Sequence, residues 1–335
     1  MKRIITGIIV LILTVSIAAA GGKKEIKPVE NVPATLRAAA LVGPSGIGMA
    51  YLFGNPPELG SPTVVTFEAA GSVDVLLPKL IKGDIDIGIL PPNVAAKLYN
   101  LAPESVVVGA VVGNGMITLI TRDPAITSLS DLAGKTVSVV GQGATPEYVM
   151  RTLLSRAGLA EGSVNLDYSL PAAEIAAALI SNKISYALVP EPFATIAVMN
   201  GTTGDNPVRR AILLRDVWNA DGLGFDFPMT LCVIRKEYAD KYPAAVGKFL
   251  DAYRNSINWT IANPLEAGKF VENAGLGLKA PVASKAIPFS NYAFMTAVEG
   301  RASIEKLLSV FLGFAPEAIG GKLPDDGFYF KYKSN

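Results

Sequence analysis

Short β-rich segments alternate with helical segments over the first two thirds of the chain, and this alternation restricts the fold more than any other feature. The predicted strands are residues 35–42, 63–67, 85–90, 105–112, 116–121, 136–140, 164–168, 186–190 and 209–214. The predicted helices between them include residues 73–81, 146–157, 172–180 and 193–199. Alternation of this kind is typical of βαβ units, so we expect an α/β protein with parallel sheets covered by helices on both faces.

The remaining third of the chain is predicted to be almost wholly helical after about residue 236. Residues 242–261 carry apolar side chains at helical spacing, and Asn263-Pro264 ends this helix. Earlier, the strand before Arg122 runs into a turn, a short helix capped by Ser128, a break at Gly134 and a new strand. We interpret this as a crossing into a second α/β domain, and residues 222–236 as the return. The expected division is a first lobe from residues 35–121 and 225–335, and a second lobe from residues 122–224.

The N-terminal residues 1–20 have the pattern of an export signal. Lys2 and Arg3 precede an apolar run at residues 4–15, and Ala18 to Ala20 form a cleavage site of the A-x-A type. The run is shorter than the roughly 20 residues needed to span a bilayer. Residues 21–34 form a polar tether like that of bacterial lipoproteins, without the lipid-bearing cysteine. We expect a soluble periplasmic or otherwise extracytoplasmic protein, membrane-tethered only if such a cysteine has been lost.

Several classes of function are disfavoured by composition. Histidine is absent from the 335 residues, which removes the usual general base and the commonest metal ligand. The single cysteine, Cys232, lies in an apolar run, and we interpret it as a buried core residue. Lys and Arg number 30 against 29 Asp and Glu, with no run of like charges. We therefore expect no metal, no cofactor and no nucleic-acid partner.

The segment VGPSGIGMA, residues 42–50, has the glycines of a nucleotide-binding P-loop without its chemical residues. Gly43 and Gly48 match the glycine positions, whereas Met49 and Ala50 replace the lysine and the hydroxyl residue. We interpret it as a strand end, a tight turn and the packed first turn of a helix, whose free N–H groups bind an acceptor group of a ligand. The candidate contacts are Ser45, Gly46 and Ile47.

Two more loops of the first lobe carry candidate ligand contacts. Pro92 and Asn93 follow a predicted strand and begin a helix, with a simple N-terminal turn as the alternative. Asn114 lies between two glycines, with a turn residue of positive φ as the alternative. For Ser45 in the preceding loop, the alternative is a helix cap.

The second lobe and the return segment supply the other candidates. Gln142 and Thr145 repeat the pattern of strand, glycine turn and helix. Glu191 lies between two prolines after an apolar strand, where it either accepts hydrogen bonds from a ligand or pairs with Arg or Lys across the lobes. Phe225, Asp226 and Phe227 lie at the return crossing and suit a ring-bearing ligand, with core packing as the alternative for at least one of the phenylalanines.

Five segments carry more specific motifs. They are AALVGPSGIGMA, LIKGDIDIGILPPNVAAKL, ITSLSDLAGKTVSVVGQGATPEYVMRTLLSRAGL, YALVPEPFATIAV and YPAAVGKFLDAYRNSINWTIANPLEAGK. Together they resemble the periplasmic solute-binding proteins of ABC transporters, in the branch that serves nitrate, sulfonate, taurine and thiamine-precursor uptake. The resemblance implies a type II periplasmic-binding-protein fold, with two lobes joined by two hinge crossings that clamp a small molecule. It also implies delivery to an ABC permease in the membrane.

The ligand class follows from charge. The candidate loops contain no Lys or Arg and two acids, Glu191 and Asp226, which favours a neutral or partly cationic heteroaromatic ligand such as a pyrimidine or flavin. Sulfonate and nitrate are less favoured, although helix N-termini bind anions without a cation. We expect a monomeric receptor and not an enzyme. The alternatives are an enzyme of the dehydratase or synthase type on the same fold, and a ligand sensor.

Overall fold

The computed structural model describes residues 32–220, 222 and 226–332. The expected signal peptide at residues 1–20, most of the tether at residues 21–34, and Phe225 lie outside these described residues. Within the described ranges, no helix combines the length and the apolar character needed to cross a membrane.

The first sheet has six strands in the order β11-β4-β10-β3-β1-β2. Their bounds are β1 (Thr35–Leu41), β2 (Val64–Ala70), β3 (Ile87–Leu90), β4 (Val106–Asn114), β10 (Pro228–Arg235) and β11 (Tyr292–Thr296). Strand β1 is parallel to β2 and β3, whereas β10 is antiparallel to both β3 and β4, and β11 is antiparallel to β4.

The second sheet has five strands in the order β7-β6-β8-β5-β9. Their bounds are β5 (Ile117–Thr121), β6 (Thr136–Val139), β7 (Asn165–Asp167), β8 (Tyr186–Pro190) and β9 (Arg209–Leu213). Strands β6, β7 and β8 are parallel, and β5 is antiparallel to β8 and β9. Both sheets are therefore mixed, not purely parallel as the alternation predicted. In each sheet, one antiparallel strand is the one by which the chain arrives from the other sheet: β10 in the first sheet and β5 in the second. An antiparallel strand of this kind needs no crossover helix.

Helices cover both faces of the first sheet, because alternate residues of its strands point to opposite sides. Leu36, Ala38 and Ala40 pack in one core with α1 and α9, and Ala39 and Leu41 pack in another with α2, α3 and α12. The bounds are α1 (Ala50–Gly54), α2 (Val73–Lys82), α3 (Pro92–Leu101), α8 (Lys236–Lys241), α9 (Pro243–Ala262), α10 (Pro264–Asn273), α11 (Ala280–Ala286) and α12 (Arg301–Phe314).

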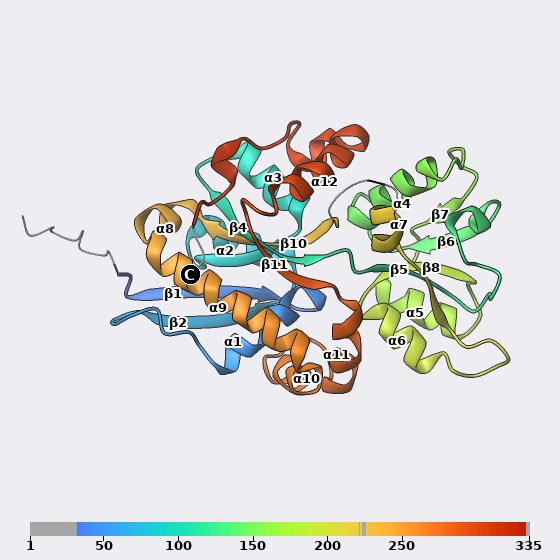
Figure 1. The fold of residues 1–335 in the computed structure, drawn as a ribbon, viewed down its shortest axis with the longest axis horizontal. Coiled ribbons are helices and arrows are strands. Elements are labelled where there is room, and N and C mark those ends of the chain that lie inside the picture. Colours follow the sequence, from blue (N-terminus) through green and yellow to red (C-terminus); the bar gives the residue numbers. More distant parts are fainter. Residues whose placement is uncertain (1–31, 221, 223–225, 333–335) are drawn as a thin grey trace, which may run out of the picture. The chain divides into compact units, whose positions relative to one another are not determined.

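The second sheet is covered in the same way, with α4 and α7 on one face and α5 and α6 on the other (Figure 1). The bounds are α4 (Thr145–Arg156), α5 (Ala172–Ile180), α6 (Phe193–Asn200) and α7 (Leu214–Ala220). Short 3-10 segments are η1 (Pro44–Met49), η2 (Leu129–Leu132), η3 (Ile287–Phe289), η4 (Pro316–Ile319) and η5 (Asp326–Phe328).

Each strand and helix predicted from the alternation is confirmed within a few residues, as is the long helix now seen as α9. The expected cap at Ser128 is confirmed as a capping box with Asp131 at the start of η2. Two details differ. Strand β11 interrupts the C-terminal third, and β5 pairs in the second sheet, so the chain leaves the first sheet after Asn114 and not at the expected boundary of residue 121.

A buried carboxylate joins three strands of the first sheet at the edge where β3 begins and β10 ends. The Asp86 side chain is fully buried and accepts hydrogen bonds from the Arg37 backbone N–H at 3.0 Å, from Arg37 Nε at 2.9 Å and from Arg37 Nη2 at 2.8 Å. Arg235 Nη2 donates to it at 3.2 Å. Asp86 thus ties β1, the start of β3 and the end of β10 together at the edge opposite the strand ends described next.

Candidate functional site

The candidate residues of the first sheet lie where its strands end. Ser45 follows β1, Pro92 follows β3, and Asn114 is the last residue of β4. Strands β1 and β3 are parallel, and β10 runs antiparallel to both β3 and β4, so these three ends lie at one edge of the sheet. Strands β10 and β11 begin at the same edge.

The corresponding edge of the second sheet lies directly across a short link. Only Gly115 and Met116 separate β4 of the first sheet from β5 of the second. The backbone N–H of Glu191, just after β8, donates to the Met116 carbonyl oxygen at 2.9 Å. We call these strand ends, together with residues 226–228 and 289–292, the crossing region. It brings polar loops from both sheets to the same place.

A polar cluster lies on the first-sheet side of the crossing region, with Asn114 buried and Asp226 and Asn291 half-buried. The Asn114 backbone N–H donates to the Asn291 carbonyl oxygen at 3.1 Å, and Asn291 Nδ2 donates to Asp226 Oδ2. Burial raises the pKa of Asp226, and the hydrogen bond from Asn291 partly offsets this. Asn114 Oδ1 is buried and accepts no hydrogen bond from the described residues. Asp226 Oδ1 is likewise buried without such a bond, and these two unpaired acceptors indicate a hydrogen-bond donor on a ligand.

The backbone of Asn114 differs from the alternative considered for it. Asn114 is an extended strand residue, whereas the positive φ in this neighbourhood belongs to Asn291, at 50°. A turn role therefore does not explain Asn114, and its side chain stays a predicted ligand contact.

On the second-sheet side, Glu191 is fully buried and bonded to protein groups. Its Oε1 accepts from Arg210 Nε at 2.8 Å and pairs with Nη2 at 2.7 Å, and its Oε2 accepts from the Thr195 backbone N–H at 3.0 Å and from Thr195 Oγ1 at 2.6 Å. This is the ion-pair alternative, with its partner on β9 of the same sheet and not across the lobes. A ligand contact by Glu191 stays a prediction.

Arg210 also reaches the first-sheet side of the crossing region. Its guanidinium carbon lies 3.7 Å from the centre of the Phe289 ring, a cation–π contact between β9 and η3. Phe289 is 38 % exposed, although it is a large aromatic residue. Arg210 therefore supplies a cation and Phe289 a ring that the candidate loops alone did not reveal.

The loop after β1 is built as a tight 3-10 turn. Gly43 has a φ of 101°, and η1 begins at Pro44 without a side-chain cap, so Ser45 does not cap it. Ser45 is half-buried, whereas Ile47 is fully buried in the core and can offer a ligand only its backbone. Met49 and Ala50 are also fully buried, which confirms them as packed residues of the first turn.

Replacing Gly46 by alanine is expected to lower the free energy of unfolding by about 2 kcal/mol or more, because overpacking forces backbone shifts. A Cβ there would lie 2.3 Å from the Leu41 carbonyl oxygen and 3.0 Å from Leu276 Cδ2. Urea denaturation measures the change. The matched control is Gly71→Ala, where no heavy atom lies within 4 Å of the added Cβ. Equal effects of the two changes would show that the close approach at residue 46 is unimportant.

The remaining candidates begin helices near the crossing region, and no hydrogen bond between described residues joins them to it. Pro92 starts α3 and is buried, with Asn93 half-buried beside it. Thr145 starts α4 and is buried, and Gln142 is exposed in the preceding loop. The expected helix starts are confirmed, and the ligand contacts remain predictions.

Arg210, Phe289 and Asn291 are the residues that sequence reasoning missed. Arg210 stands in the strand segment RRAILL, where a charged residue beside apolar ones signals a paired or functional position. Phe289 and Asn291 precede β11, the strand hidden in a largely helical region. Their role depends on pairing between distant segments.

The chemistry available to the crossing region is hydrogen bonding and aromatic contact. Cys232 is fully buried, as expected, and burial raises the pKa of its thiol. The described residues contain no cluster of three or more metal-binding side chains. Such a set of groups can bind and orient a small molecule.

Known families and structures resemble this chain over most of its length. The family model described as NMT1/THI5 like matches residues 68–267. No curated protein sequence matches the chain. An ABC transporter structure from Parabacteroides distasonis is 26 % identical, with a TM-score of 0.76, and the match covers 90 % of this chain and 100 % of that one.

Two further structures share the fold at lower identity. The periplasmic aliphatic sulphonate binding protein SsuA from Escherichia coli is 16 % identical with a TM-score of 0.72, and 89 % of this chain and 98 % of that chain are covered. The periplasmic nitrate-binding protein NrtA from Synechocystis PCC 6803 is 14 % identical with a TM-score of 0.58, and the coverage is 84 % and 82 %. These matches confirm the expected fold class of two α/β lobes.

Proposed function

The chain belongs to the NMT1/THI5-like family, and from this membership we propose that it is the extracytoplasmic substrate-binding receptor of an ABC importer. It closes its two lobes on a small organic ligand and delivers that ligand to a membrane permease. One observation carries the proposal: polar strand ends of both sheets meet at the link of Gly115 and Met116, where Asn114 Oδ1 is buried without a hydrogen-bond partner among the described residues. The similar folds of transporter binding proteins support it.

The side chains favour ligand binding over catalysis. Histidine is absent from the sequence, and Cys232 is buried. Glu191 is engaged by Arg210 and Thr195, and Asp226 by Asn291, and these hydrogen bonds of the described residues give neither acid the general acid or base partner that a dehydratase needs. The receptor would be exported by residues 1–20 and act as a monomer in the periplasm.

A neutral planar ligand, such as a pyrimidine or flavin, fits the charges of the crossing region best. Arg210 neutralises Glu191, and burial raises the pKa of Asp226, so the two acids do not create a strongly negative site. Phe289 offers an exposed ring for stacking, and Asn114 Oδ1 accepts a hydrogen bond. Sulfonate and nitrate are the second candidates, because helix N-termini can bind anions without a cation.

A thermal-shift screen tests this function. Pyrimidines, flavins, sulfonates and nitrate are compared at equal concentration, and one class is expected to raise the melting temperature by mass action. At a ligand concentration of 100 times Kd, binding raises the free energy of unfolding by about 2.7 kcal/mol. Asn114→Leu should abolish that shift, whereas Asn206→Leu, at an exposed position outside the crossing region, should keep it. Chemical turnover of a compound that gives no stabilisation would favour the enzyme alternative.

A further inference from the structure

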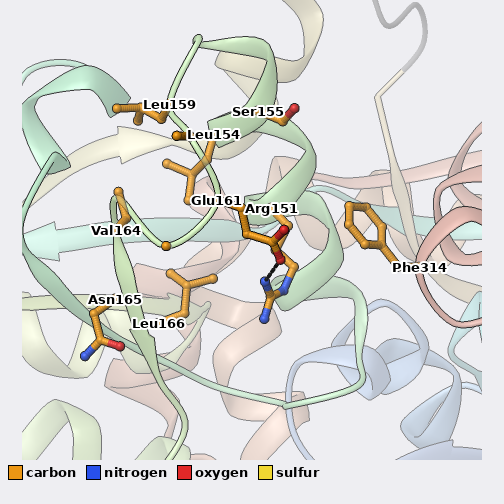
Figure 2. A pocket seen from close by; sticks show the side chains of 11 residues that line it. Arg151, Leu154, Ser155, Leu159, Glu161, Val164, Asn165, Leu166 and Phe314 are labelled. Carbon is orange, nitrogen blue, oxygen red and sulfur yellow. Dashed lines mark ion pairs between the residues drawn. The ribbon is translucent and has the colours of Figure 1, made fainter.

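A cavity of about 410 Å³ lies beside α4 and β7, and none of its lining residues belongs to the crossing region. Figure 2 shows its walls, formed by α4, the following loop, β7 and one residue from the end of α12. This volume lies within the range of about 300 to 1,000 Å³ of small-molecule sites. The apolar walls are Leu154, Leu159, Val164, Leu166 and Phe314.

Arg151 is the only cation among these lining residues. Its side chain interacts with Glu147, Glu161 and Tyr168 and is still 34 % exposed. Its Nε donates to Glu147 Oε1 at 2.8 Å. Its Nη1 lies 3.8 Å from Glu161 Oε1, which is beyond hydrogen-bond distance, and the Glu161 side chain is 93 % exposed (Figure 2). A carboxylate that enters the cavity can therefore displace Glu161 with little loss.

We propose that this cavity is a second ligand site that binds a small monocarboxylate with an apolar body. The planar guanidinium of Arg151 matches a carboxylate and holds it through the edge that Glu147 leaves open. The apolar walls remove the hydrocarbon body of the ligand from water. A single cation suits a monoanion better than a phosphate, which carries more charge.

The cavity is lined by residues of two helices, α4 and α12, which cover different sheets. Phe314 comes from α12, and its ring stacks on Tyr148 of α4 with 5.6 Å between ring centres. On the other side, Glu147 links Arg151 to the Gly143 backbone N–H at 2.7 Å, in the loop that carries Gln142. A substitution of Arg151 would therefore also loosen that loop, so Ala160 and Glu161 are better positions for a test.

Isothermal titration calorimetry with 4-methylpentanoate and 3-phenylpropanoate tests the proposal. Both acids are expected to bind the full chain with one site per molecule, and their uncharged amides at least roughly tenfold more weakly, because the amides lose the charged pair. Absence of binding by both acids, or equal binding of acids and amides, would overturn the proposal.

Three variants locate the site. Ala160→Phe, at an exposed lining position, fills the cavity and should remove binding. Glu161→Gln removes the competing charge and should strengthen binding roughly threefold, as expected for an exposed pair. Ala262→Phe, at an exposed position on α9, should change nothing. Binding that survives Ala160→Phe, or that weakens in Glu161→Gln, contradicts the assignment. No ligand of the crossing region is used, so the proposed function stands or falls separately.

Discussion

Replacing Asp86 by alanine is expected to lower the free energy of unfolding by about 3–5 kcal/mol, because removing one partner of a buried ion pair leaves charges and donors unpaired. The Asp86 side chain has no exposure, and it accepts from Arg37 and Arg235 at once. The Arg37 backbone N–H would lose its acceptor as well. Urea denaturation followed by circular dichroism measures the loss.

The matched control is Glu68→Ala. Glu68 pairs with Lys79 at 2.6 Å, but both side chains are more than one third exposed, at 38 % and 39 %. An exposed pair contributes at most about 1 kcal/mol, so the control should unfold almost like the wild type. If Asp86→Ala were as mild as the control, the carboxylate would not be what holds β1, β3 and β10 together at that edge.

The sequence predicted the strands well because their signal is local. Residues 105–112 form an apolar, valine-rich run, and β4 is buried at each of its nine residues. The crossing was placed too late because the apolar character of the valine run in β4 continues into β5, interrupted only by Gly113, Asn114 and Gly115. Sheet membership is decided by distant pairs such as Ile117 with Pro190, which a local pattern does not contain.

The candidate site was predictable in its loops but not in its charges. A carboxylate such as Glu191 after an apolar strand requires a partner, and this much follows from the sequence. Which arginine pairs with Glu191 depends on strand register. Arg210 lies opposite Ile120, next to an irregularity in β9. Its neighbour Arg209 instead donates to the backbone oxygens of Asp123 and Ile126. The net charge around the candidate loops, from which the ligand class was predicted, therefore could not be obtained without the strand register.

Replacing Glu191 by glutamine is expected to destabilise the ligand-free protein by about 3 kcal/mol or more, as for other broken buried pairs. Glutamine keeps the shape and an acceptor for Thr195, but it leaves Arg210, whose side chain is 12 % exposed, without its counter-charge. The contact of Arg210 with Phe289 would weaken too, because the guanidinium loses its anchor. Urea denaturation without added ligand measures the change.

The double variant Glu191→Gln with Arg210→Gln separates the structural role of Glu191 from a ligand role. Removing both charges leaves no unpaired ion, so the double variant should be more stable than the sum of the single effects predicts. Glu305→Gln, which alters the half-exposed pair with Arg301, should cause only a small loss. If Glu191 served mainly to accept hydrogen bonds from a ligand, Glu191→Gln would leave the ligand-free protein as stable as the wild type and reduce only its affinity. A large loss of stability together with strong coupling to Arg210 assigns the carboxylate to the fold, and leaves the buried, unpaired oxygens of Asn114 and Asp226 as the acceptors for a ligand to satisfy.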